Sequence, residues 1–88
     1  MRGSLDKDFK TRLKKFIITE CELNLDIDDI DDDSPLFGSR SPVGLDSIDG
    51  FQMAIAIQNT YGIKITDSKQ MGRVMKSINT FADFLQPA

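Results

Sequence analysis

The sequence predicts an all-α fold: a small four-helix bundle of three longer helices and one short helix, with a long loop between the first two. Two observations lead to this prediction. Apolar residues recur at helical spacing in residues 5–22 and again in residues 47–61. Between them, residues 24–45 are rich in Asp, Ser and Pro, which favour loop structure. A chain of 88 residues has a modest core, so we treat residues 1–88 as a single domain.

The first predicted helix spans residues 5–22 and is amphipathic. Its apolar face consists of Leu5, Phe9, Leu13, Phe16 and Ile17. Basic residues occupy much of the rest, namely Lys7, Lys10, Arg12, Lys14 and Lys15. We expect this basic face to be solvated rather than to bind nucleic acid. Cys21 is expected to be a small apolar residue at the end of the helix. Residues 1–4 have the Met-Arg-Gly-Ser sequence of a cloning remnant, and we assign them no function.

The loop over residues 24–45 contains six aspartates between positions 26 and 33. An EF-hand calcium loop needs a central Gly and a Glu at its twelfth position, and this acidic stretch has neither. We therefore expect a solvated acidic loop held down by its apolar residues, with Leu36 and Phe37 as anchors. A loop of this length in a compact domain often carries function.

The stretch Gly44-Leu45-Asp46-Ser47-Ile48 has the pattern of a helix start. It places the Ser47 hydroxyl beside free backbone N–H groups and the positive end of a helix dipole. A phosphate attached there would be stabilised. The alternative is that Asp46 or Ser47 is only an N-cap, a common role for both residue types.

The helix that follows, residues 47–61, has two apolar faces. The first, expected in the core, contains Gly50, Met53, Ala54, Ile57 and Tyr61. The second contains Ile48, Phe51 and Ile55 beside Gln52, Gln58 and Asn59. Apolar residues among polar ones suggest a surface for a protein partner. The alternative is that the long loop covers Phe51 and Ile55.

Two shorter helices are predicted after Gly62, which is typical of a helix C-terminus. The first begins at a cap among Thr66, Asp67 and Ser68 and ends near Met75. The second begins at Asn79 or Thr80 and ends at Leu85. The residues expected to face inward are Met71, Val74, Met75 and Ile78.

Composition excludes several classes of function. The chain has no His and one Cys, so His-based catalytic sites, His metal ligands and Cys-rich zinc sites are absent. Residues 20–49 carry ten acidic side chains and one basic one, which disfavours a nucleic-acid partner. No apolar run approaches the ~20 residues of a membrane span, and no secretory segment follows Met1. We expect a non-enzymatic, cytoplasmic protein without catalytic or metal-binding residues.

The segment Gly44–Asp49 resembles the Asp-Ser-Leu attachment motif of acyl carrier proteins (ACPs), with Ile48 in place of the usual Leu. Three further segments follow the order of that family. Residues 34–38 resemble part of its long first loop, residues 61–65 the end of its second helix, and residues 80–85 its last helix. The resemblance therefore covers nearly the whole chain.

The resemblance implies a monomeric carrier for fatty-acid, polyketide or related biosynthesis. A phosphopantetheinyl transferase would attach 4′-phosphopantetheine to Ser47, flanked by Leu45, Asp46 and Ile48, and the arm would hold acyl groups as thioesters. An acyl-ACP synthetase, a ketosynthase or other acyl-processing enzymes would be its partners, contacting Asp49, Phe51, Gln52 and Ile55. An attached acyl chain is expected to enter the bundle around the core side chains Met53, Ile57, Met71, Val74 and Met75.

The sequence departs from the family in its charges. Family members usually carry acidic residues along the second and third helices. Here Gln52, Gln58 and Asn59 follow Asp49, and Lys69, Arg73 and Lys76 occupy the third-helix region. These differences favour a specialised carrier over a housekeeping one. Two alternatives stay open: an unmodified helical interaction module, and an aminoacyl or peptidyl carrier.

Overall fold

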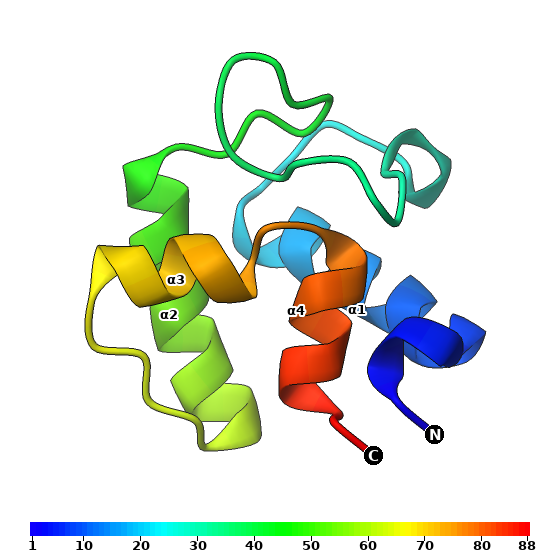
Figure 1. Cartoon of the computed structure of the whole chain (residues 1–88). Coiled ribbons are helices and arrows are strands. Elements are labelled where there is room, and N and C mark those ends of the chain that lie inside the picture. The colour runs from blue at the N-terminus through cyan, green and yellow to red at the C-terminus, as the bar shows by residue number, and fades with distance from the viewer.

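The computed structural model describes all 88 residues and confirms the all-α fold (Figure 1). Its four α-helices are α1 (Lys7–Glu20), α2 (Ser47–Tyr61), α3 (Ser68–Val74) and α4 (Ile78–Leu85). Two single-turn 3-10 helices, η1 (Gly3–Leu5) and η2 (Ile27–Asp29), flank α1. The long loop between α1 and α2 lies across one end of the bundle, and α3 crosses α2 (Figure 1). No helix has the length and apolar character needed to span a bilayer.

Each α-helix begins at a side chain that caps it. Asp6, Asp46, Asp67 and Ser77 accept a hydrogen bond from the backbone N–H three residues later. Such a bond satisfies one of the N–H groups that a helix start leaves without a partner. Asp67 was among the predicted caps, but the prediction of Asn79 or Thr80 for the last helix is wrong. Ser77 caps α4 by accepting from the Thr80 N–H, so the helix begins two to three residues earlier than predicted.

The first helix is shorter than predicted because Asp6 caps it at Lys7. Leu5 belongs to η1 and is 67% exposed, so its predicted place on the buried face is wrong. Phe9, Leu13 and Ile17 are buried as expected. Cys21 follows the helix as its C-cap and is half-buried.

The core combines residues from all four α-helices. Its largest fully buried helical side chains are Leu13, Ile17, Met53, Ile57, Ile78 and Phe81. Met71 and Met75 are also buried and Val74 packs against the core, which confirms the inward face predicted for this region. Tyr61 differs from the prediction: it is 37% exposed and rests edge-on against the Phe16 ring. Ala56, which the periodicity did not single out, is buried instead.

Residues 3–5 pack against α4, which places the two termini side by side (Figure 1). The Gly3 N–H donates to the Gln86 carbonyl at 2.8 Å, and the Ser4 N–H donates to Asp83 Oδ1 at 2.8 Å. A Cβ at Gly3 would overlap the Ala82 carbonyl, so only glycine fits. This segment, to which the sequence assigned no function, is part of the packed domain.

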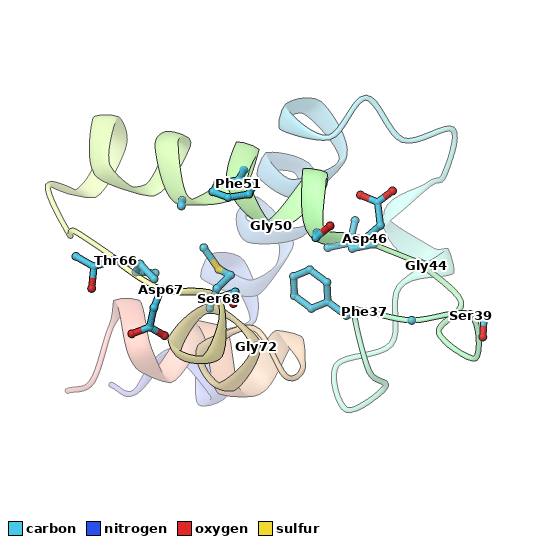
Figure 2. A pocket seen from close by; sticks show the side chains of 16 residues that line it. Phe37, Ser39, Gly44, Asp46, Gly50, Phe51, Thr66, Asp67, Ser68 and Gly72 are labelled. Carbon is cyan, nitrogen blue, oxygen red and sulfur yellow. The ribbon is translucent and has the colours of Figure 1, made fainter.

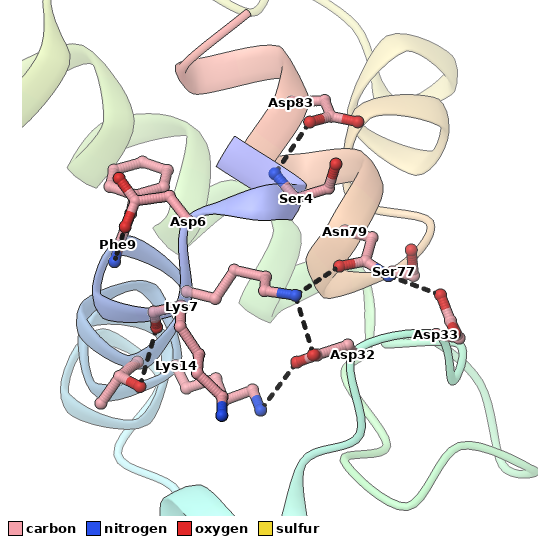
Figure 3. A network of polar contacts seen from close by, with 12 residues as sticks. Ser4, Asp6, Lys7, Phe9, Lys14, Asp32, Asp33, Ser77, Asn79 and Asp83 are labelled. Carbon is pink, nitrogen blue, oxygen red and sulfur yellow. Dashed lines mark hydrogen bonds and ion pairs between the residues drawn. The ribbon is translucent and has the colours of Figure 1, made fainter. Parts of the chain in front are cut away.

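The acidic loop is tied to the bundle by charged groups (Figure 3). Lys10 Nζ lies 2.9 Å from Asp32 Oδ2, and Lys14 Nζ lies 2.8 Å from Asp32 Oδ1. The Asn79 N–H donates to the Asp32 carbonyl at 3.0 Å, and its side chain donates to Asp33. The lysine side chains are only 13% and 14% exposed. The expectation of a solvated basic face and a fully solvated acidic loop is therefore wrong at these positions.

Apolar side chains also hold the same loop against the core, as predicted. Ile30 and Leu36 are buried, and Phe37 packs against the core while remaining half-buried. The loop then closes on itself, because the Leu45 N–H donates to the Leu36 carbonyl and the Gly38 N–H donates to the Leu45 carbonyl. These hydrogen bonds fix the position of Leu45, two residues before α2 begins.

Replacing Asp32 with Asn should lower the free energy of unfolding by about 1 kcal/mol at pH 7, a modest value because the side chain is 38% exposed. Lys14 and then Lys10 hold the pKa of Asp32 below its ordinary value, despite partial burial that acts to raise it. A lowered pKa stabilises the fold above the unfolded-state pKa, and this stabilisation is lost as the pH falls through the folded-state pKa.

The measurement is chemical denaturation of both proteins between pH 7 and about pH 2, where carboxylates become protonated. The difference between Asp32→Asn and the wild type should vanish at the acidic end. Asp28→Asn is the control, since Asp28 is exposed and should leave stability unchanged. A difference that persists at low pH would assign the effect to packing instead of charge.

Candidate functional site

The start of α2 is fixed by two reciprocal hydrogen bonds. The Asp49 N–H donates to Asp46 Oδ1 at 3.0 Å, and the Asp46 N–H donates to Asp49 Oδ2 at 3.1 Å. This is a capping box, with Asp in the place of the more usual Glu. Asp46 is therefore the N-cap, and Ser47 is the first residue of the helix. The alternative in which Ser47 acts as the cap is wrong.

Ser47 is exposed, and its hydroxyl takes part in no hydrogen bond within the protein. Its own N–H and that of Ile48 precede the first hydrogen bond of the helix, so they have no partner in it. The dipole of a 15-residue helix points its positive end at the same place. Free N–H groups and a helix dipole together stabilise a phosphate next to the serine oxygen.

A cleft of about 720 Å³ opens beside this serine, between α2, α3 and the loop (Figure 2). Ser39 lies at one end and Thr66 at the other, with Asp46 between them (Figure 2). The residues that make its surface mostly apolar are Phe37, Leu45, Phe51, Ala54, Ile65 and Met71. Ser47 itself lines the cleft, so a group on its oxygen would have an apolar surface within reach.

The cleft lies to one side of the place that the sequence predicted for an acyl chain. Of the five core residues expected around such a chain, only Met71 lines the cleft. Met53, Ile57 and Met75 are fully buried in the core, and none of them lines the cleft. The open volume lies instead where the loop, α2 and α3 meet.

Three apolar side chains of α2 face away from the core. Ile48 is 75% exposed, Phe51 74% and Ile55 56%. The alternative in which the long loop covers Phe51 and Ile55 is therefore wrong. Spacings of three and four residues place these three side chains in one stripe along the helix. We call them the α2 patch; Gln52 beside them is exposed and Asp49 is half-buried.

The start of α2 and the α3 region carry different charges. At the start of α2, burial together with the Asp49, Glu20 and Asp46 carboxylates raises the pKa of the Cys21 thiol to about 11. That thiol is protonated at neutral pH, which makes it a poor nucleophile. In the α3 region, the exposed charges are the N-cap Asp67 and the cations Lys69, Arg73 and Lys76.

The structure brings together most of the residues that the sequence predicted. Asp46 and Ser47 lie at the helix start, and Leu45, although buried, lines the cleft. The contributions of Phe37 and Ile65 to the cleft were missed. The only signal was their apolar character in segments adjoining a helix, which does not reveal that the two segments meet. No group of three or more metal-ligating residues forms.

A family model described as a phosphopantetheine attachment site matches residues 16–85 of the chain. No curated protein and no solved structure gives a significant match. Proteins of the matched family carry 4′-phosphopantetheine covalently on a serine, and they act as carriers served by phosphopantetheinyl transferases and acyl-processing enzymes. With the match spanning most of the chain, and a free serine hydroxyl at a helix start, this protein belongs to the phosphopantetheine-attachment-site family of carrier proteins.

Proposed function

We propose that Ser47 is the attachment serine and that the protein carries acyl intermediates as thioesters on the phosphopantetheine arm. The observation that supports this most is the position of the Ser47 hydroxyl. It is exposed, makes no hydrogen bond within the protein, and stands at the first residue of α2 on the edge of an apolar cleft.

The residues around Ser47 fit the group. The free N–H groups of Ser47 and Ile48 suit its phosphodiester, and the capping box holds the helix start in place. When bound, the arm supplies a terminal thiol that forms thioesters. In the attachment step, Ser47 Oγ forms a bond to the β-phosphorus of coenzyme A, and the bond from that phosphorus to adenosine 3′,5′-bisphosphate breaks. The serine proton passes to a base of the transferase, because the chain has no His and the Ser47 hydroxyl makes no hydrogen bond to any base within the protein.

The cleft favours an apolar acyl chain over an aminoacyl cargo. Its interior is lined by aliphatic, aromatic and thioether side chains. The carboxylates on its surface, Asp46 and Asp67, each accept a hydrogen bond from a helix N–H as N-caps. Both carboxylates are exposed to solvent, so an ammonium group would gain little from pairing with either of them. This supports a role in fatty-acid, polyketide or related biosynthesis, with an acyl-ACP synthetase or a ketosynthase as partner.

Incubation of the protein with coenzyme A, Mg²⁺ and a broad-specificity phosphopantetheinyl transferase tests the proposal. One phosphopantetheine should be added, and peptide mass spectrometry should place it on the peptide that contains Ser47. Absence of addition, or addition to another serine, would contradict the proposal. Absence would favour the alternative that the α2 patch serves an unmodified interaction module. Intact mass of the protein from its native host, with the thioester preserved, would identify the cargo.

A further inference from the structure

Two glycines, Gly50 and Gly72, are the only ones that lie within α-helices, and both line the cleft. Gly50 comes from α2 and Gly72 from α3, so the two helices that border the cleft each contribute one (Figure 2). Gly50 lies about one turn after Ser47 on the same helix.

The backbone does not require glycine at either position. The glycines with positive φ are Gly38, Gly44 and Gly62, in loops or at a helix end. Within a helix, glycine is less stable than alanine because it loses more conformational entropy on folding. A local structural reason for glycine would have to come from steric crowding.

Crowding does not require glycine either. A Cβ on Gly72 would meet no atom within 4 Å. A Cβ on Gly50 would lie 3.5 Å from Cε1 of Phe37 and 3.8 Å from Cγ of Met71, which are ordinary contact distances. The contrast is Gly3, where a Cβ would overlap the Ala82 carbonyl. What Gly50 and Gly72 share is a place on the surface of the cleft where a larger residue would fit without a clash.

We propose that Gly50 and Gly72 set the width of the cleft and so determine which apolar acyl chains it admits from Ser47. This inference rests on the proposed function, because it assumes an acyl chain on the arm. A side chain at Gly72 would project into space that is now open, and a methyl group at Gly50 would add a contact with Phe37 and Met71, two residues that line the cleft. Both changes leave Ser47 and its capping box untouched.

The test uses the full chain loaded directly from acetyl-, octanoyl- and dodecanoyl-coenzyme A by a broad-specificity transferase. Intact mass spectrometry follows cleavage of each thioester by hydroxylamine. In the wild type, the dodecanoyl form should react more slowly than the acetyl form, on the order of tenfold, because a chain held in the cleft draws the thioester away from water. Gly72→Leu should remove most of this difference, and Gly50→Ala should remove part of it.

Lys69→Leu is the matched control, since it introduces the same side chain on α3 at an exposed position outside the cleft. It should retain the wild-type difference. Thermal unfolding of Gly50→Ala and Gly72→Leu should occur at or above the wild-type temperature, because both new residues favour helix.

The outcomes separate this inference from the proposed function. Suppose that Ser47 is loaded in both proteins and that the dodecanoyl thioester is protected from hydroxylamine equally in the wild type and in Gly72→Leu. This result would overturn the role of the glycines and leave the carrier function intact. If Ser47 is loaded but the rate of hydroxylamine cleavage does not depend on chain length, the chain stays outside the cleft. This result would also overturn the inference. Failure to load Ser47 would overturn the proposed function, and this inference with it.

Discussion

Replacing Ser47 with Ala should abolish the addition of phosphopantetheine completely while leaving the fold unchanged. The first effect follows because alanine lacks the oxygen that bonds to phosphorus. The second follows because Asp46, not Ser47, caps α2, and the Ser47 hydroxyl makes no hydrogen bond within the protein. Alanine also favours helix more than serine does, so stability should be equal or slightly higher. Intact mass after transferase treatment and thermal unfolding by circular dichroism measure the two effects.

The chain offers a closely matched control in Asp67-Ser68. There, as at Asp46-Ser47, an aspartate caps a helix and a serine is its first residue, and both serines line the same cleft. The difference is that α3 has seven residues and no capping box, whereas α2 has fifteen residues and a reciprocal one. Ser68→Ala should be loaded like the wild type. Loading that survives in Ser47→Ala but disappears in Ser68→Ala would move the site to α3.

Replacing Ile55 with Ala should weaken binding to a cognate partner enzyme about ten- to hundredfold. Ile55 belongs to the α2 patch and is 56% exposed, so a partner that covers the patch would bury its side chain. Burial of an aliphatic side chain of this size contributes about 1.5–3 kcal/mol, and each ~1.4 kcal/mol is a factor of ten in affinity. Gln52→Ala is the control on the same helix and should cost less, because a polar side chain at the rim contributes little.

Salt dependence provides a second measurement on the same complex. Exposed charge pairs are screened beyond about 8 Å at physiological ionic strength, whereas apolar contacts are not. Between residues 46 and 61, the charged side chains are those of Asp46 and Asp49. The affinity for the partner enzyme should therefore fall only weakly as the salt concentration rises. The experiment is titration against the cognate ketosynthase or synthetase from low to high salt. Steep salt dependence with an unaffected Ile55→Ala variant would reject the α2 patch and favour the exposed aspartates of residues 26–33.

The sequence by itself determined the features that arise from short-range interactions. An aspartate cap, a helix start and a left-handed Gly62 involve residues three or four positions apart, so their pattern can be read along the chain. The placement of Ser47 at the start of a helix and the exposure of the α2 patch followed from this local pattern. The start of the last helix was misplaced by two to three residues because Ser77, Asn79 and Thr80 are all acceptable caps, and in the structure it is Ser77 that accepts the Thr80 N–H.

The tertiary structure alone decided which distant groups meet. Asp32 pairs with Lys10 and Lys14, and Asn79 binds the same loop from more than forty residues away. The cleft likewise combines a loop, α2 and α3, so its position depends on how two helices cross and where Phe37 anchors. A helical period shows which side chains share a face, but it carries no information about what packs against that face. The apolar groups therefore indicated a core and an exposed patch, while the space between them was set by the packing of the whole chain.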